Sequence, residues 1–285
     1  MENLSPIALP VTIEIHPYLR DHRFDGRAVF PAVETMQLLA RAAGNRLGDT
    51  ALHRITQARF DKFLPVPDKA EQVEVLVDLG PPEKGRIEAR LKTRIKAGKS
   101  AMTRVKTHGR IRVSALAGQA PGPVPQDLEP QPFREGFGVD PQRIYAELVP
   151  FGPSYRNICE PLRLAPDGTA ARIRAPHLPA DEQPLGSPFV LDAAFHAACV
   201  WGQRYANVVA FPVALERRSV WRPTRAGETY TAVVLPGKVD AERLIFDLRI
   251  FDGKQRICET VDGVEMRDVS GGRWKPPAWI GVGKR

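Results

Sequence analysis

Long segments of strictly alternating apolar and polar residues are the feature that most restricts how this chain can fold. In residues 86–96 (RIEARLKTRIK), Ile87 and Leu91 fall on one side and the charged residues on the other. Residues 72–79 and 100–113 continue the pattern, and Gly-containing connections separate the three segments. Because the side chains of a strand point alternately to its two faces, this period predicts half-buried strands. The three segments are predicted to form an antiparallel meander.

Two apolar helices are predicted among the alternating segments. The first covers residues 31–43, where Val33 and Met36 recur at helical spacing before a stop at Gly44. The second covers residues 189–206 (FVLDAAFHAACVWGQRYA). A helix that is apolar on most of its circumference is normally surrounded by protein, so both helices are expected to be wrapped by sheet.

Each helix is accompanied by further alternating segments. A short strand is predicted at 11–15, and the second half of the chain has such segments at 143–149, 169–175, 210–221, 228–236, 242–252 and 255–268. This order of elements predicts an α+β protein with antiparallel sheets. A central apolar helix wrapped by a curved antiparallel sheet, present twice, is a double hotdog, although periodicity alone does not single out that fold.

The composition changes mark four parts of the chain. They are a first unit (1–113), a linker rich in Pro and Gly (114–141), a second unit (142–270) and a Gly/Pro-rich tail (271–285). The tail carries Trp274 and Trp279, which are expected to dock onto the body of the protein or onto a partner.

Composition also narrows the class of function. No apolar run approaches the roughly 18–20 residues of a membrane helix, and no secretory signal precedes the first strand, so a cytoplasmic protein without a membrane partner is expected. The formal net charge is +8. Its basic residues are spread along alternating strands, and nucleic-acid binding is therefore not expected. The histidines His53, His108 and His177 are scattered, and no metal site is expected.

A first candidate site lies just before the first helix. His22, Gly26 and Pro31 have the spacing H-x-x-x-G-x-x-x-x-P. Glycine permits a sharp turn and the close approach of a ligand, and an imidazole on such a loop can exchange protons near neutral pH. Taken alone, the pattern is also compatible with a loop histidine that is hydrogen-bonded to backbone.

A second candidate site lies in the second helix. Asp192 and His196 are four residues apart in LDAAFH and so share one helix face. An N-terminal capping Asp with a satisfied core histidine is the structural alternative. The apolar surroundings, however, predict a raised pKa for the Asp192 carboxyl, as suits a general acid.

Together these segments resemble the dehydratase domains of modular polyketide synthases and of animal fatty-acid synthases. The HPYL-x-DH lead-in, the H-x-x-x-G-x-x-x-x-P motif, FGPSY (151–155), LDAAFH (191–196) and FPV (211–213) are similar to family segments and follow the family order. The chain has Ala32 where the family often has Gly, Phe151 for a usual Tyr, and Phe211 for a usual Leu. These departures affect substrate contacts more than the His or the Asp.

The resemblance implies a role for each matching residue. His22 would be the catalytic base, Asp192 the acid, and His196 the residue that orients Asp192. The substrate-binding residues it implies are Gly26, Pro31, Phe151, Gly152, Pro153, Tyr155, Phe211 and Pro212. Backbone N–H groups near Gly26, or at the N-terminus of a central helix, would polarise the thioester carbonyl.

The resemblance also implies a double-hotdog fold and a dehydratase. Its reaction would remove water from a 3-hydroxyacyl thioester to give a 2-enoyl thioester, in polyketide or fatty-acid-like biosynthesis. The substrate would be carried on the phosphopantetheine of an acyl carrier protein, with no other cofactor. A homodimer is the default expectation, and a basic chain suits an acidic carrier, although +8 also serves solubility. Two alternatives stay open: a relative that isomerises, hydrolyses or templates cyclisation, and a non-catalytic scaffold module.

Overall fold

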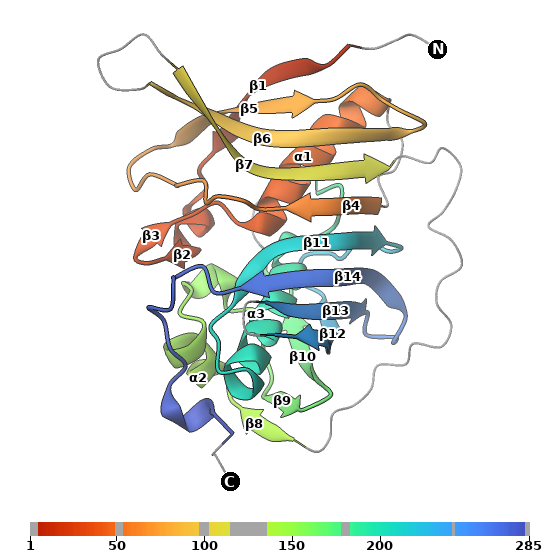
Figure 1. Ribbon diagram of the computed structural model, residues 1–285. Coiled ribbons are helices and arrows are strands. Elements are labelled where there is room, and N and C mark those ends of the chain that lie inside the picture. Colours follow the sequence, from red (N-terminus) through yellow and green to blue (C-terminus); the bar gives the residue numbers. More distant parts are fainter. Residues whose placement is uncertain are drawn as a thin grey trace.

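Twelve antiparallel strands form one continuous sheet in the computed structural model, which describes residues 5–48, 54–96, 103–114, 136–177, 183–240 and 243–282. The strand order is β1-β5-β6-β7-β4-β11-β14-β13-β12-β10-β9-β8. Helices α1 and α3 pack against the same broad sheet, one in each half of the molecule (Figure 1). The predicted α+β double hotdog is confirmed.

The first half supplies five strands of this sheet and its first helix. These elements are β1 (Ile7–Glu14), α1 (Ala32–Leu47), β4 (Arg54–Arg59), β5 (Gln72–Leu79), β6 (Arg86–Lys96) and β7 (Thr103–Ser114). The alternation predicted in the meander is visible in its burial: Val75 and Val77 of β5 are buried. Helix α1 packs against β5, β6 and β7. A small hairpin, β2 (Arg23–Phe24) and β3 (Arg27–Ala28), stands apart from the sheet.

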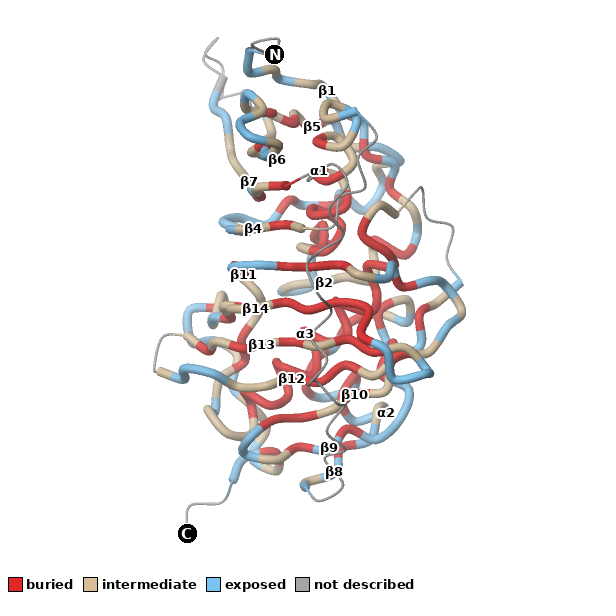
Figure 2. The backbone as a smooth tube through the Cα atoms, turned by 90° about the vertical axis from the view of Figure 1, so that its right-hand side faces the viewer, coloured by how far each residue is buried: buried red, intermediate tan, exposed pale blue. Residues whose placement is uncertain are grey.

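The second half repeats this plan with seven strands. Its elements are β8 (Phe137–Val139), α2 (Pro141–Arg143), β9 (Leu162–Ala165), β10 (Gly168–Arg174), α3 (Pro188–Tyr205), β11 (Phe211–Val220), β12 (Thr229–Val239), β13 (Leu244–Phe251) and β14 (Ile257–Arg267). Every residue of α3 from Pro188 to Gln203 is buried. Figure 2 shows both central helices among the most buried parts of the chain.

The two halves meet edge to edge. Strand β4 of the first half pairs with β11 of the second, with Ile55 opposite Arg218 and Arg59 opposite Ala214. The two sheets that the sequence predicted are therefore joined into one. Within the described residues, no helix is both long enough and apolar enough to cross a membrane.

Several predicted boundaries change in the structure. Helix α1 does not stop at Gly44 but runs on to Leu47, because its left-handed C-terminal residue is Gly48 (φ +72°). Residues 143–149, predicted as a strand, are helical: α2 is followed by a π-helical turn, Ile144–Leu148. Asp140 and Pro141 supply the N-cap and first-turn proline of that helix.

The predicted linker is only partly described. Residues 115–135 lie outside the described part of the chain, whereas Ser114 ends β7 and the segment 136–141 contains β8 and the start of α2. The division of the chain at 113 and 142 stays a prediction.

A buried polar network ties the halves together behind the sheet. The backbone N–H of Leu185 donates to Gln37 Oε1 of α1 (3.1 Å), and the Gln37 amide donates to the carbonyl of Gly186. Arg218 on β11 donates to the carbonyl of Leu185 (3.1 Å) and to Glu259 Oε2 (2.8 Å). Because Leu185 is bound from both sides, this network fixes α1 of the first half against β11 of the second.

The ion pair in this network yields a stability prediction. Arg218 and Glu259 side chains are 1% and 2% exposed. Glu259→Ala leaves a guanidinium buried without its partner and is expected to lower the free energy of unfolding by about 3–5 kcal/mol. The double variant Arg218→Met with Glu259→Leu removes both charges and is expected to cost much less. Urea unfolding followed by circular dichroism measures both. A double variant as unstable as Glu259→Ala would contradict this account.

Candidate active site

A cavity of about 710 Å³ lies where the two halves meet. Its lining comes from the β2–β3 hairpin, the start of α1, residues 60–65, β7, α3, β11 and β14. His22, Asp192 and His196 all line this cavity, although they come from opposite halves of the chain. The structure therefore brings together the three residues that the sequence singled out for chemistry.

His22 is held by its backbone and by aromatic rings. It follows a 3-10 turn (Pro17–Asp21), and its Nδ1 lies 3.0 Å from the carbonyl oxygen of Val29. The ring stacks on Phe151, with centroids 4.4 Å apart and an angle of 23° between the planes. Because a carbonyl oxygen only accepts hydrogen bonds, Nδ1 carries the proton and Nε2 of neutral His22 keeps a free lone pair.

The surroundings keep the His22 imidazole neutral. Burial lowers the pKa of His22 below its ordinary value of 6.5, and this effect outweighs the opposing attraction of Asp192. The nearby His196 also lowers it. A neutral ring with a free Nε2 is the form that can accept a proton.

Asp192 and His196 form a close pair on α3. Asp192 Oδ2 and His196 Nε2 are 2.9 Å apart, and both side chains are buried. The contact is an ion-pair distance without the alignment of a hydrogen bond, so neither atom has a hydrogen-bond partner among the described residues. On its other side, His196 Nδ1 lies 3.4 Å from the Tyr145 hydroxyl. That hydroxyl accepts a hydrogen bond from the backbone N–H of Ile158 (3.0 Å).

The predicted raised pKa of Asp192 is wrong. Burial does favour the neutral carboxyl, but attraction by His196 and then by His22 outweighs it. The pKa of Asp192 therefore lies below its ordinary value. The sequence showed the apolar helix around Asp192, and the burial it implied is present. Whether burial or the attraction of the two imidazoles decides the pKa of Asp192 depends on interatomic distances, and a sequence pattern does not contain these distances.

The FGPSY segment is fastened to the His22 loop by Asp21. The backbone N–H of Gly152 donates to the Asp21 carbonyl (2.8 Å), and that of Ser154 donates to Asp21 Oδ2 (3.0 Å). A Cβ atom at Gly152 would collide with the Asp21 carboxylate. This close approach explains the glycine and places Phe151 on the face of His22.

Several predicted substrate-binding residues do not line the cavity. Phe151, Phe211 and Pro212 do line it, but Gly26, Pro31, Gly152, Pro153 and Tyr155 do not. Gly152 and Pro153 shape the turn that positions Phe151, and Pro31 is the N-cap of α1. Tyr155 is fully buried, with its ring 5.1 Å from that of His22. These residues affect the cavity indirectly, by positioning the side chains and the helix that do line it.

Gly26 likewise serves the backbone. It occupies the two-residue Asp25–Gly26 loop between β2 and β3, with φ of +74°. Both loop residues have positive φ, as the tight turns of short hairpins require. The hairpin carries Phe24 and Arg27, which do line the cavity.

Sequence reasoning missed most of the cavity wall. The apolar wall includes Phe24, Phe63, Phe195, Cys199 and Met266. Tyr145 was missed because its segment was taken for a strand; the Asp-Pro helix start at 140–141 was the available signal. The other wall residues carry no local pattern that marks them.

The C-terminal tail packs against the body of the protein, which is one of the two arrangements that the sequence left open. The Trp274 ring stacks on Phe24 (centroids 4.7 Å apart) and meets Phe211 edge-on (5.7 Å). Arg273 pairs with Asp25 at 2.6 Å. Trp279 lies elsewhere, against the Arg143 guanidinium (3.4 Å from its ring centroid). The tail therefore braces the β2–β3 hairpin at the edge of the cavity.

The arrangement suits proton transfer on an acyl-sized molecule. A neutral imidazole and a carboxylate–imidazole pair face one largely apolar space, so a proton can be removed at one position of a ligand and delivered at another. Among the described residues, no three His, Cys, Asp or Glu side chains gather as metal ligands.

Comparison with protein families finds two matching models. One, described as the polyketide synthase dehydratase N-terminal domain, matches residues 125–274, more than half of the chain. The other, described as the polyketide synthase dehydratase domain, matches residues 10–94. Together the two matched ranges include His22, Asp192 and His196.

Similar individual proteins fall in the same group. Polyketide synthase PksM of Bacillus subtilis (strain 168) is 22% identical over 275 residues, which is 91% of this chain but only 6% of the relative. A trans-AT synthase dehydratase domain from Brevibacillus brevis has a TM-score of 0.72 and 21% identity, covering 93% of this chain and 96% of that one. The dehydratase domain from the CurJ module of the curacin synthase has a TM-score of 0.73 and 17% identity, covering 94% and 93%.

The electrostatics of the cavity can be tested without any ligand. In an NMR titration of the His22 ring, the midpoint is expected below 6.5. Because the charge of Asp192 raises the His22 pKa, Asp192→Asn is expected to lower the midpoint further. Asp61→Asn, which changes a carboxylate of the same cavity that is not among the main influences on the His22 pKa, is the control. A midpoint that rises in Asp192→Asn would show that the two side chains are not coupled as described.

Proposed function

The chain belongs to the polyketide synthase dehydratase family, and on this premise we propose that it removes water from a 3-hydroxyacyl thioester to give a 2-enoyl thioester. The single observation that carries the proposal is the meeting of His22 with the Asp192–His196 pair in one cavity. The chain spans 6% of the curated synthase it matches, so the substrate and partners belong to the proposal.

His22 is the proposed base. Its Nδ1–H is held by Val29, which leaves Nε2 to take the proton from C2 of the substrate. The lowered pKa keeps the ring unprotonated before the reaction. Phe151 supports the ring by stacking, and its missing hydroxyl removes no contact from the His22 imidazole nitrogens.

The Asp192–His196 pair is the proposed acid. Because the pKa of Asp192 is lowered chiefly by His196 against the effect of burial, the proton needed by the leaving hydroxyl is held by the pair rather than by Asp192 alone. It reaches the hydroxyl oxygen through the carboxyl as the C3–O bond breaks, and water leaves. The proton on His22 then returns to the pair. Tyr145 positions His196 from behind.

The substrate carbonyl needs a hydrogen-bond donor when charge builds up on it. Ala32, the first residue of α1, lines the cavity, and first-turn N–H groups have no partner within a helix. The start of α1 is therefore the proposed donor, in place of Gly26. The apolar wall around Phe195 and Met266 accommodates the acyl chain.

The proposal includes a carrier and a second copy of the chain. The thioester is delivered by the phosphopantetheine of an acyl carrier protein within polyketide synthesis, or fatty-acid-like synthesis. A homodimer is supported by β1, which forms one edge of the sheet among the residues that the structure describes. A cytoplasmic location stays a prediction of the sequence.

The proposed roles can be tested with a 3-hydroxybutyryl thioester of N-acetylcysteamine. His22→Ala and Asp192→Asn are each expected to lower kcat/KM for enoyl formation by about 10²–10⁴-fold, because each removes one proton-transfer group. Absorbance of the enoyl thioester and mass spectrometry measure the product, and circular dichroism checks folding. A folded His22→Ala variant with wild-type turnover would remove the base assignment. An isomerised or hydrolysed product would favour a different reaction in the same cavity.

The tail makes a separate prediction about substrate binding. Trp274→Ala removes the stacking partner of Phe24 and Phe211 and is expected to raise KM for the same thioester by about tenfold, with kcat and its pH dependence little changed. Trp279→Ala is the matched control, since that ring packs against Arg143 away from the cavity. Equal effects of the two variants would mean that the tail acts only on global stability.

A further inference from the structure

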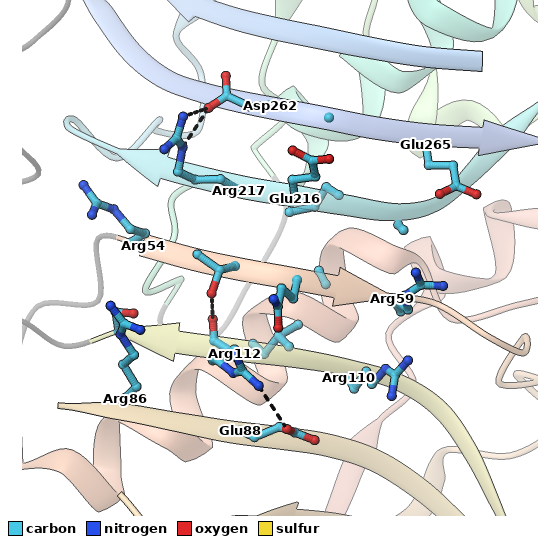
Figure 3. A pocket seen from close by; sticks show the side chains of 18 of the residues that line it. Arg54, Arg59, Arg86, Glu88, Arg110, Arg112, Glu216, Arg217, Asp262 and Glu265 are labelled. Carbon is cyan, nitrogen blue, oxygen red and sulfur yellow. Dashed lines mark hydrogen bonds and ion pairs between the residues drawn. The ribbon is translucent and has the colours of Figure 1, made fainter. Parts of the chain in front are cut away.

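A second hollow lies on the sheet face that points away from the helices. It has a volume of about 1050 Å³ and crosses β4, β6, β7, β11, β13 and β14. On β4, the buried Ile55 points to the core, whereas its neighbours Arg54 and Thr56 line the hollow. Figure 3 shows a group of arginines on β4, β6 and β7, here named the arginine groove: Arg54, Arg59, Arg86, Arg110 and Arg112.

Strand register sets these arginines side by side. Arg110 of β7 lies opposite Arg90 of β6 on one side and opposite Arg59 of β4 on the other. In a second row, Ser114 separates Arg86 from Arg54. Like charges directly opposite one another in a sheet are destabilising. The first row, with Arg110 directly opposite Arg59, therefore costs folding free energy that an anionic partner would recover.

Among the described residues, most of these guanidinium groups form no ion pair with an Asp or Glu side chain. Within the described residues, no ion pair or side-chain hydrogen bond engages the guanidinium groups of Arg59, Arg86 or Arg110. By contrast, Arg112 lies 3.8 Å from Glu88, and Arg217 across the groove lies 2.8 Å from Asp262. Arg59, Arg86 and Arg110 are also exposed.

The arginine groove continues toward the mouth of the active-site cavity. Arg59 ends β4, and the next residues, from Phe60 to Lys62, line that cavity. Along β7, Lys106 lines the cavity and Arg110 lines the groove. Basic residues at the cavity, Lys62 and Lys106, therefore follow the arginines of the groove along the chain, although Asp61 lies between Arg59 and Lys62.

We propose that the arginine groove is the docking surface for an acidic face of the carrier protein that delivers the thioester. This inference rests on the proposed function, and it adds the surface on which the partner sits. Arginine forks pair well with carboxylates. Because the far wall carries Glu216 and Glu265, the acidic face of the carrier is expected to contact the arginines on β4, β6 and β7 and not that wall (Figure 3).

The electrostatic origin of the docking has a measurable signature. Contacts between exposed charges are screened by salt, and they act mainly on the rate of association. The KM for a carrier-bound substrate is therefore expected to rise with ionic strength. The KM for a small uncharged thioester, which enters the cavity without using the groove, is not.

The experiment compares one acyl group on two carriers. A 3-hydroxybutyryl group is presented on the phosphopantetheine of a polyketide synthase acyl carrier protein and on N-acetylcysteamine. The variant Arg59→Glu with Arg110→Glu is expected to raise KM for the carrier-bound substrate by about tenfold or more and to remove its salt dependence. Turnover of the small thioester is expected to stay at the wild-type level, because neither arginine lines the cavity.

The matched control is Arg163→Glu with Arg174→Glu, which reverses two exposed charges on β9 and β10, outside both hollows. Binding of the carrier protein is measured in parallel by fluorescence anisotropy. An equal loss of carrier binding in both double variants, or no loss in either, overturns the docking surface. A change of oligomeric state in the groove variant with carrier binding intact also overturns it, in favour of a second copy. If neither thioester is dehydrated but the carrier binds through Arg59 and Arg110, the proposed function fails and the surface stands.

Discussion

The backbone pairing of β4 with β11 is the constraint on which the rest of the molecule depends. His22 belongs to the first half and Asp192 to the second, and nothing local brings them together. The edge-to-edge pairing places α1 and α3 on a common sheet and opens the cavity at the junction. Gln37, Leu185 and Arg218 then lock the helix layer to the same junction. A shift of this pairing would change the position of His22 relative to Asp192.

Within the cavity, burial and charge act against each other on the same side chains. Burial favours the neutral forms of both His22 and Asp192. For the histidine, burial prevails and the ring stays neutral; for the carboxyl, two imidazoles prevail and the charged form is favoured. The site therefore holds a neutral imidazole, which can accept a proton, in the same cavity as a carboxyl that favours its charged form. Tyr145 contacts the His196 ring and Phe151 stacks on the His22 ring, so both help to set the distances on which this balance depends.

The sequence predicted what is local and missed what depends on packing. Strands β5 and β6 have the predicted bounds, 72–79 and 86–96, because a two-residue period needs no tertiary information. The motif spacing likewise found His22, Asp192 and His196. Tyr145 was missed because a short helical turn resembles a strand in apolar content. Gly26 was predicted to bind substrate, whereas its positive φ serves a hairpin turn. A glycine required for backbone conformation and a glycine required for contact with a ligand cannot be told apart in a sequence.

The distribution of basic residues is a second feature that the sequence alone does not reveal, because it depends on how the strands pair. Along the chain the arginines are dispersed on alternating strands, which argued against nucleic-acid binding. Register across β6, β7 and β4 gathers them into rows. A bulge in β7, where the pairing with β6 shifts between Gly109 and Thr107, interrupts the alternation, so that His108 lines the cavity whereas Arg110 lines the arginine groove. One strand thus presents a face to the chemistry and a face to a partner. A change in its register would be felt at both, so docking and catalysis are linked by strand geometry without any moving part.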